Sequence, residues 1–96
     1  MITSNQASVI GKLMQARTAL VGELSQANAD LLRTLQLASG FDILRMKGPR
    51  SLEDVRNESD ADRKIASIRT VIDGLESDLA QVDRQMENAM NQESQQ

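Results

Sequence analysis

The stretch that decides the fold runs from residue 61 to residue 89 and reads ADRKIASIRTVIDGLESDLAQVDRQMENA. Its apolar side chains recur at alternating steps of four and three residues, and most other positions are polar or charged. The ladder consists of Ala61, Ile65, Ile68, Ile72, Leu75, Leu79, Val82, Met86 and Ala89. This alternation is typical of a helix that packs on another helix along a coiled-coil seam. We therefore predict a helix over 59–90, followed by a disordered tail over 91–96.

A second apolar ladder occupies the first part of the chain, over 4–39. Its members are Val9, Leu13, Ala16, Leu20, Leu24, Ala27, Leu31, Leu35 and Ala38. From the second member onwards the steps repeat every eleven residues, an average of about 3.67 residues per turn. A strict heptad would instead place Arg17 and Thr34 on the seam, so we prefer the eleven-residue repeat. We predict that this helix ends before Gly40, because glycine suits the left-handed residue that closes many helices.

The two ladders predict an all-α protein in which residues 1–96 form a single helical domain. The simplest arrangement is a long helical hairpin, an antiparallel coiled coil, that assembles into a four-helix bundle or a larger helical complex. The connecting segment over 40–58 is longer than most bundle loops, and a short helix is expected within it over 51–57. Alternatively, the two helices pair between chains instead of within one.

The chain lacks the residues on which most catalysis and metal binding depend. It contains no histidine and no cysteine, so the commonest general base and the thiolate nucleophile are both missing. The carboxylates Asp73, Glu76, Asp83 and Glu87 follow helical spacing, and a solvated outer face explains them better than a metal site. We expect no enzyme activity, no cofactor, no metal and no small-molecule substrate.

Charge and hydropathy limit the compartments and the classes of partner that we expect for this chain. No apolar run is long enough to cross a bilayer. The net charge is −3, with the acidic side chains concentrated in the second half of the chain, which does not favour contacts with a phosphate backbone. We expect a cytoplasmic protein, or a component of a virion or a secreted assembly, that binds protein partners or its own copies and no membrane.

The first helix is apolar over more than one row. Only five of the first forty residues are charged, fewer than a helix exposed on its far side usually carries. This width predicts that the helix is buried against two neighbours, although a wide row that only covers its own hairpin is the alternative. The expected interface with a partner or a second copy comprises Ile10, Met14, Leu20, Val21, Leu24, Leu31, Leu32, Phe41, Ile43, Leu44 and Met46.

The segment over 41–50 combines large apolar side chains with three cations. Loops are usually polar, so this composition needs a reason. One interpretation is a plug, in which the apolar side chains fold over the open end of the hairpin. The other is a binding patch, in which methionine adapts its shape and a basic patch attracts an acidic target. The three cations are Arg45, Lys47 and Arg50.

Three functions follow from these patterns, in order of preference. The first is a non-enzymatic structural, assembly or adaptor protein that acts through helix–helix packing and oligomerisation. The second is a small acidic regulator or inhibitor, a class that includes phage-encoded proteins and secretion chaperones, which binds one target protein. The third is an RNA-binding four-helix bundle, which rests only on the basic patch and Arg56.

Overall fold

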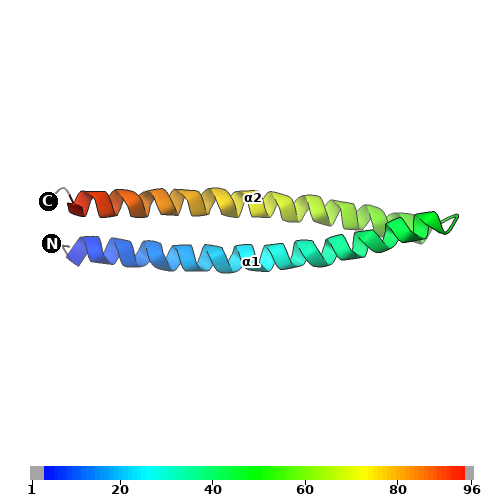
Figure 1. Cartoon of the computed structure of the whole chain (residues 1–96), viewed down its shortest axis with the longest axis horizontal. Helices are drawn as coiled ribbons and strands as arrows, with labels where there is room; N and C mark the ends of the chain where they lie inside the picture. Colours follow the sequence, from blue (N-terminus) through cyan, green and yellow to red (C-terminus); the bar gives the residue numbers. More distant parts are fainter. Residues whose placement is uncertain (1–3, 95–96) are drawn as a thin grey trace. The chain divides into compact units, whose positions relative to one another are not determined.

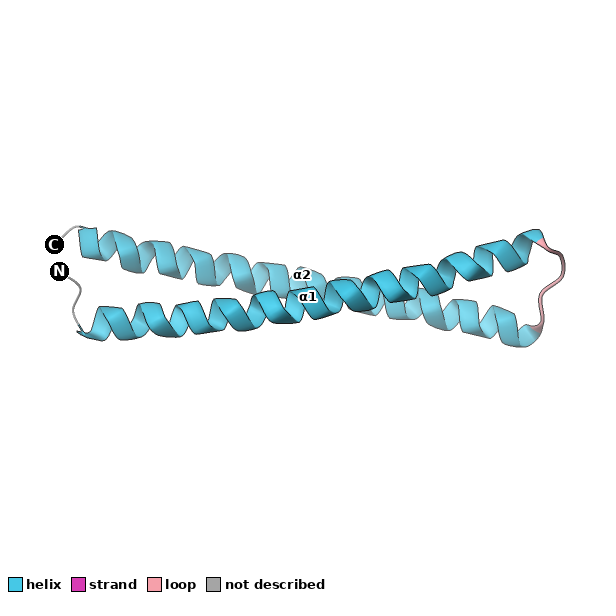
Figure 2. Ribbon diagram, turned by 60° about the horizontal axis from the view of Figure 1, so that its bottom comes forward, coloured by secondary structure: helices cyan, strands magenta, loops and turns pink. Residues whose placement is uncertain are grey.

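In the computed structural model, which describes residues 4–94, the chain forms two long helices and a short turn (Figure 1). Helix α1 spans Ser4–Met46 and helix α2 spans Leu52–Ser94. The loop between them, coloured pink in Figure 2, covers residues 47–51. The helices pack against each other as an antiparallel hairpin, which confirms the predicted all-α fold class.

The hairpin divides into two compact units, each containing a part of both helices. We call residues 1–25 and 74–96 the terminal unit and residues 26–73 the turn unit. In each unit a segment of α1 packs on a segment of α2 that runs in the opposite direction. The sequence predicts one domain, and the same pattern of seam residues continues through both units.

The seam on α2 follows the 4-3 ladder. All nine of its residues are buried or half-buried, and Ala61 and Ile72 are among the most enclosed side chains described, at 5% and 8% exposure. The same register extends back toward the turn through Glu58, which is buried, and Asp54, which is half-buried. Neither acid was predicted to lie on the seam. The burial of Glu58 is explained by its contacts with Arg45 and Arg50, which lie on either side of the turn.

The eleven-residue repeat predicted for α1 is wrong. Val9, Ala16 and Leu35 from that ladder are exposed, whereas Thr34 is buried at 4% exposure. The enclosed positions instead follow a strict heptad, as those on α2 do, because two helices in a coiled coil must share one period. The buried or half-buried residues of this seam are Ile10, Leu13, Leu20, Leu24, Ala27, Leu31, Thr34, Ala38 and Phe41.

Local bonds explain how the heptad of α1 tolerates two polar residues. The hydroxyl of Thr34 donates to the carbonyl oxygen of Asp30 at 2.8 Å, so it is satisfied within its own helix. Arg17 occupies a seam position but leaves the apolar layer, because its Nε reaches Oδ1 of Asp83 on α2 at 2.9 Å. Both side chains of this pair are about half exposed, so it contributes only ~0.2–1 kcal/mol to stability.

The predicted end of the first helix at residue 39 is also wrong, because α1 continues to Met46. Gly40 lies inside the helix, and the described chain has a positive φ only at Gly48, at 127°. Burial of Phe41 one residue later outweighs the weak helix propensity of glycine, a penalty of ~1 kcal/mol. The true stop is Gly48 followed by Pro49, a glycine-then-proline ending that is common after helices.

Helix α2 begins at Leu52, earlier than the predicted residue 59, and runs to Ser94 instead of residue 90. The segment expected as a separate short helix over 51–57 is therefore its first turns. Ser51 caps it: the backbone N–H of Asp54 donates to Oγ of Ser51 at 3.1 Å, and the N–H of Ser51 donates to Oδ2 of Asp54 at 3.4 Å. The last two residues of the predicted tail, 95–96, lie outside the described residues.

Candidate interaction surfaces

The first candidate surface is a row of exposed residues on α1, each one position after a heptad seam position, that runs from Ala7 to Ser39; the next position of the row is the charged Asp42. We call this row the outer stripe. Every member is exposed and uncharged, six of them in the terminal unit and four in the turn unit. The outer stripe consists of Ala7, Gly11, Met14, Thr18, Val21, Ser25, Asn28, Leu32, Leu35 and Ser39. Its steps of four and three are those of a second helix-packing seam.

The corresponding row on α2 is chemically different. Its members are also exposed, but six of the ten are charged. The row consists of Ser59, Asp62, Ala66, Arg69, Asp73, Glu76, Ala80, Asp83, Glu87 and Met90. This composition is that of a solvated face, so α2 has one packing seam and α1 has the pattern of two.

The structure divides the predicted interface on the first helix into two groups. Met14, Val21 and Leu32 lie on the outer stripe and are 54%, 42% and 58% exposed. The second group faces α2 and forms part of the seam of the hairpin itself: Ile10, Leu20, Leu24 and Leu31. Leu20, Leu24 and Leu31 were members of the predicted ladder, and they were assigned to the interface because the helix was expected to pack against two neighbours. Ile10 was predicted to lie beside the ladder, whereas the structure places it on the seam.

The predicted segment over 41–50 is neither a loose loop nor a plug. Its first six residues continue α1. Phe41 is buried in the seam, but Ile43, Leu44 and Met46 are 55%, 39% and 86% exposed. On the other side of the turn, Leu52 is 67% exposed. Met46 and Leu52 are the two most exposed large apolar side chains among the described residues.

Two of the three cations in the predicted basic patch form ion pairs within the hairpin. Glu58 lies in the seam at 8% exposure, and its carboxylate contacts the guanidinium groups of both Arg45 and Arg50. Arg45 also approaches Asp42 at 3.8 Å. Two cations thus balance a buried carboxylate that would otherwise be strongly destabilising. Of the three predicted cations, Lys47 is the one that does not contact Glu58, and it is exposed.

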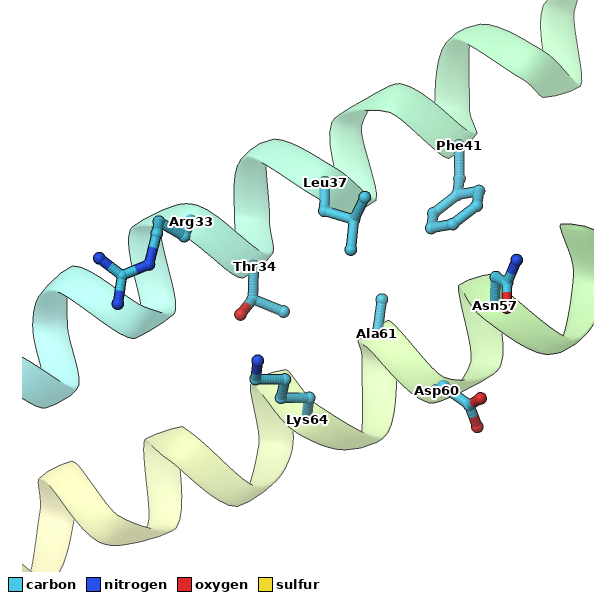
Figure 3. Close-up of a pocket in the computed structure, with 8 residues that line it drawn as sticks. All are labelled: Arg33, Thr34, Leu37, Phe41, Asn57, Asp60, Ala61 and Lys64. Atoms are coloured by element: carbon cyan, nitrogen blue, oxygen red, sulfur yellow. The ribbon is translucent and has the colours of Figure 1, made fainter.

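A groove of about 530 Å³ lies along the seam of the turn unit. It opens where the seam carries the small side chains of Thr34 and Ala61, which leave space beside Phe41. In Figure 3, Leu37 and Phe41 point from α1 toward α2, and Lys64 points back. Leu37 lies on the rim at 59% exposure. The lining residues are Arg33, Thr34, Leu37, Phe41, Asn57, Asp60, Ala61 and Lys64.

A shallower groove of about 380 Å³ lies in the terminal unit. Its apolar lining residues are Val9, which is 49% exposed, and the half-buried Leu13 and Ala89. Its polar lining residues, all on α2, carry three side-chain amides that can donate and accept hydrogen bonds. These amides belong to Gln85, Asn88 and Gln92.

The described residues offer little for chemistry of other kinds. No group of three or more carboxylates among them is placed to hold a metal ion. Within the same part of the chain, neither helix has a stretch of the length and apolar character that a membrane span requires.

Comparison with known proteins leaves the surfaces to be interpreted from their own chemistry. No model of a protein family matches this chain, and no curated protein or solved structure is significantly similar to it.

Proposed function

We propose that this chain is a non-enzymatic structural protein that builds a helical assembly by docking through the outer stripe of α1. The observation that carries the proposal is the contrast between two equivalent rows. The row on α1 is uncharged from Ala7 to Ser39, whereas the row on α2 carries six charges among its ten residues. A helix face that only meets water has no need to avoid charge over so many turns.

The distribution of exposed apolar side chains supports the same proposal. Among the described residues, nine large apolar side chains of α1 are exposed, compared with four on α2. Four of these nine lie on the outer stripe: Met14, Val21, Leu32 and Leu35. Burying a Leu, Val or Met side chain fully contributes ~1.5–3 kcal/mol, and exposed apolar side chains that share one face mark interaction sites. Small residues such as Gly11 and Ser25 alternate with the larger ones, which lets a second helix approach closely.

The chain offers a matched pair of substitutions to test this proposal. Met14 and Met90 lie in the same unit, one residue after a seam position on α1 and on α2, and are 54% and 48% exposed. Met14→Glu should weaken assembly at least ten-fold, because it buries a carboxylate at the interface. Met90→Glu should leave assembly unchanged. Light scattering coupled to gel filtration over a concentration series measures both, with helicity recorded on the same samples.

The salt dependence of binding distinguishes this proposal from the alternative of a small acidic regulator. Docking through an uncharged stripe should vary little between low and high salt, whereas binding through the acidic row of α2 should weaken steeply as salt screens its charges. Leu32→Glu on the outer stripe and Val71→Glu on α2 make a further comparison in the turn unit, at 58% and 51% exposure, although Val71 lies one residue before its seam residue and not after it. A wild-type chain that stays monomeric at every concentration, or equal effects within each pair, would contradict the proposal.

A further inference from the structure

The outer stripe of α1 matches itself when a second copy is laid along it in the opposite direction. Helix α1 is continuous from Ser4 to Met46, and the members of the stripe alternate in steps of four and three residues. This alternation reads the same from either end, so an antiparallel copy can place every member opposite another member. The layers pair Ala7 with Ser39, Gly11 with Leu35, Met14 with Leu32, Thr18 with Asn28 and Val21 with Ser25.

The side chains in these layers are complementary in size. Leu35 would lie opposite Gly11, and Val21 would lie opposite Ser25. A Cβ at Gly11 would meet no atom within 4 Å, so packing within the hairpin does not require a glycine there. When large side chains face small ones across a contact, the layers of two helices interdigitate without a clash or a void.

The layer of Thr18 and Asn28 is complementary in hydrogen bonding. The hydroxyl of Thr18 donates to the carbonyl oxygen of Met14 in its own helix at 3.0 Å, so its oxygen is left to act as an acceptor. The side-chain amide of Asn28 has two donor hydrogens. An antiparallel copy therefore brings a donor to an acceptor, and polar groups that become buried need such partners.

Other arrangements of the same stripe match less well. In a parallel pair each residue faces its own copy, so Thr18 would bring two acceptors together and Gly11 would leave a void. Moving the antiparallel copy by one heptad leaves two of the ten members of the stripe without an opposite member. It also places the polar Thr18 opposite Val21 or Leu35, depending on the direction of the shift.

We propose that the outer stripe of one copy packs antiparallel on the outer stripe of a second copy in the register given above. The contact is isologous, because each residue meets its opposite member in both directions, and it therefore closes after two copies. Two hairpins joined in this way form a four-helix bundle. The inference rests on the proposed function, since it names the occupant of the surface through which that function acts.

A pair of opposite charges tests the register, because Met14 of each copy should meet Leu32 of the other. Met14→Glu and Leu32→Lys should each weaken the association at least ten-fold, since each places a lone charge in an apolar layer. A chain with both substitutions should associate at least ten-fold more tightly than either single variant, because both layers then contain an ion pair. Light scattering coupled to gel filtration over a concentration series measures all three variants, with helicity recorded on the same samples.

The matched control combines Met14→Glu with Val21→Lys. Val21 is exposed on the same stripe but faces Ser25 in the proposed register, so this chain should associate no more tightly than Met14→Glu alone. If both single variants weaken the association and the double variant does not recover it, the register is wrong while the proposed function stands. If neither single variant weakens the association, the proposed function fails with it.

Cysteine cross-linking gives an independent measurement, because the natural chain contains no cysteine. Ala7→Cys and Ser39→Cys change small, exposed side chains at the two ends of the stripe. Mixed under a mild oxidant, the two variants should form the mixed disulfide dimer at least ten-fold faster than either links to itself. Mass spectrometry distinguishes the mixed dimer from the others. A parallel pair would reverse this preference and overturn the proposal.

Leu32→Cys provides the control for the register in the cross-linking experiment. It lies seven residues before Ser39, which is about 10 Å along a helix and beyond the reach of a disulfide. Its mixture with Ala7→Cys should therefore cross-link at least ten-fold more slowly than the mixture of Ala7→Cys and Ser39→Cys. Equal rates for the two mixtures would overturn the register.

Discussion

Helices α1 and α2 have the same length, 43 residues each, but they differ in how many faces can be buried. Both contribute one seam to the hairpin in the same heptad register. In the row one residue after the seam, most side chains of α2 are charged, whereas those of the outer stripe of α1 are uncharged and partly apolar. Two helices that match along their shared seam can therefore have unrelated surfaces, and the second surface is where function can be sought.

The largest expected effect separates the inner row of α1 from its outer stripe. Leu20 and Leu24 are half-buried in the seam, so replacing both with Asp should destabilise the hairpin by at least ~4 kcal/mol. Since small domains are stable by only ~5–15 kcal/mol, we expect most helicity to be lost at 37 °C. Thermal unfolding followed by circular dichroism measures the effect.

The outer stripe supplies the control for that experiment. Leu32→Asp with Leu35→Asp makes the same chemical change at positions that are 58% and 38% exposed. This variant should keep its helicity and its melting temperature within a few degrees. If both double variants unfolded alike, the distinction between the two rows of α1 would be lost.

A smaller effect is expected from the one acid of α2 that is buried. Glu58→Gln keeps the shape but removes the charge that balances Arg45 and Arg50, which should destabilise the hairpin by ~1–3 kcal/mol. Glu76→Gln, on the exposed row of the same helix, should change stability by less than ~0.5 kcal/mol. Urea unfolding of the two variants compares them directly, and equal midpoints would show that the contacts of Glu58 contribute nothing to stability.

The smallest effect distinguishes two glycines by its sign. Gly40 lies within α1, and a Cβ there would meet no atom within 4 Å, so Gly40→Ala should stabilise the hairpin by ~0.5–1 kcal/mol. Gly48 has a φ of 127°, so Gly48→Ala should instead destabilise it through backbone strain. If Gly40→Ala destabilised the hairpin instead, this result would support the prediction from the sequence that the first helix ends at residue 39.

The fold class was predictable because the ladder of α2 is unbroken from Ala61 to Ala89. The seam of α1 was not, since Arg17 and Thr34 occupy heptad positions that look unsuitable for a core. Arg17 is accommodated by Asp83, a residue distant in sequence, and Thr34 by a bond inside its own helix. The strict heptad of α2 was the available clue, because paired helices must share one period.

The candidate surfaces were predictable in part. The excess of apolar residues on the first helix was visible, and Met14, Val21 and Leu32 were named from it. Sequence reasoning missed Leu35 as an exposed residue and the exposed Leu52 next to the turn, because both depend on the register. It also could not assign Arg45 and Arg50, since their roles follow from the burial of Glu58.

The antiparallel course of the chain has a mechanical consequence. Ser4 and Ser94, the two ends of the described chain, belong to the same unit, and the turn belongs to the other. Tension applied between the two ends would peel the helices apart one heptad layer at a time, so only a few contacts resist at any moment. Tension applied between one end and the turn would instead pass along the single helix that connects them and leave the seam unloaded. A hairpin pulled by its two ends should therefore open at low force, whereas one pulled between an end and its turn should resist until that helix itself unravels.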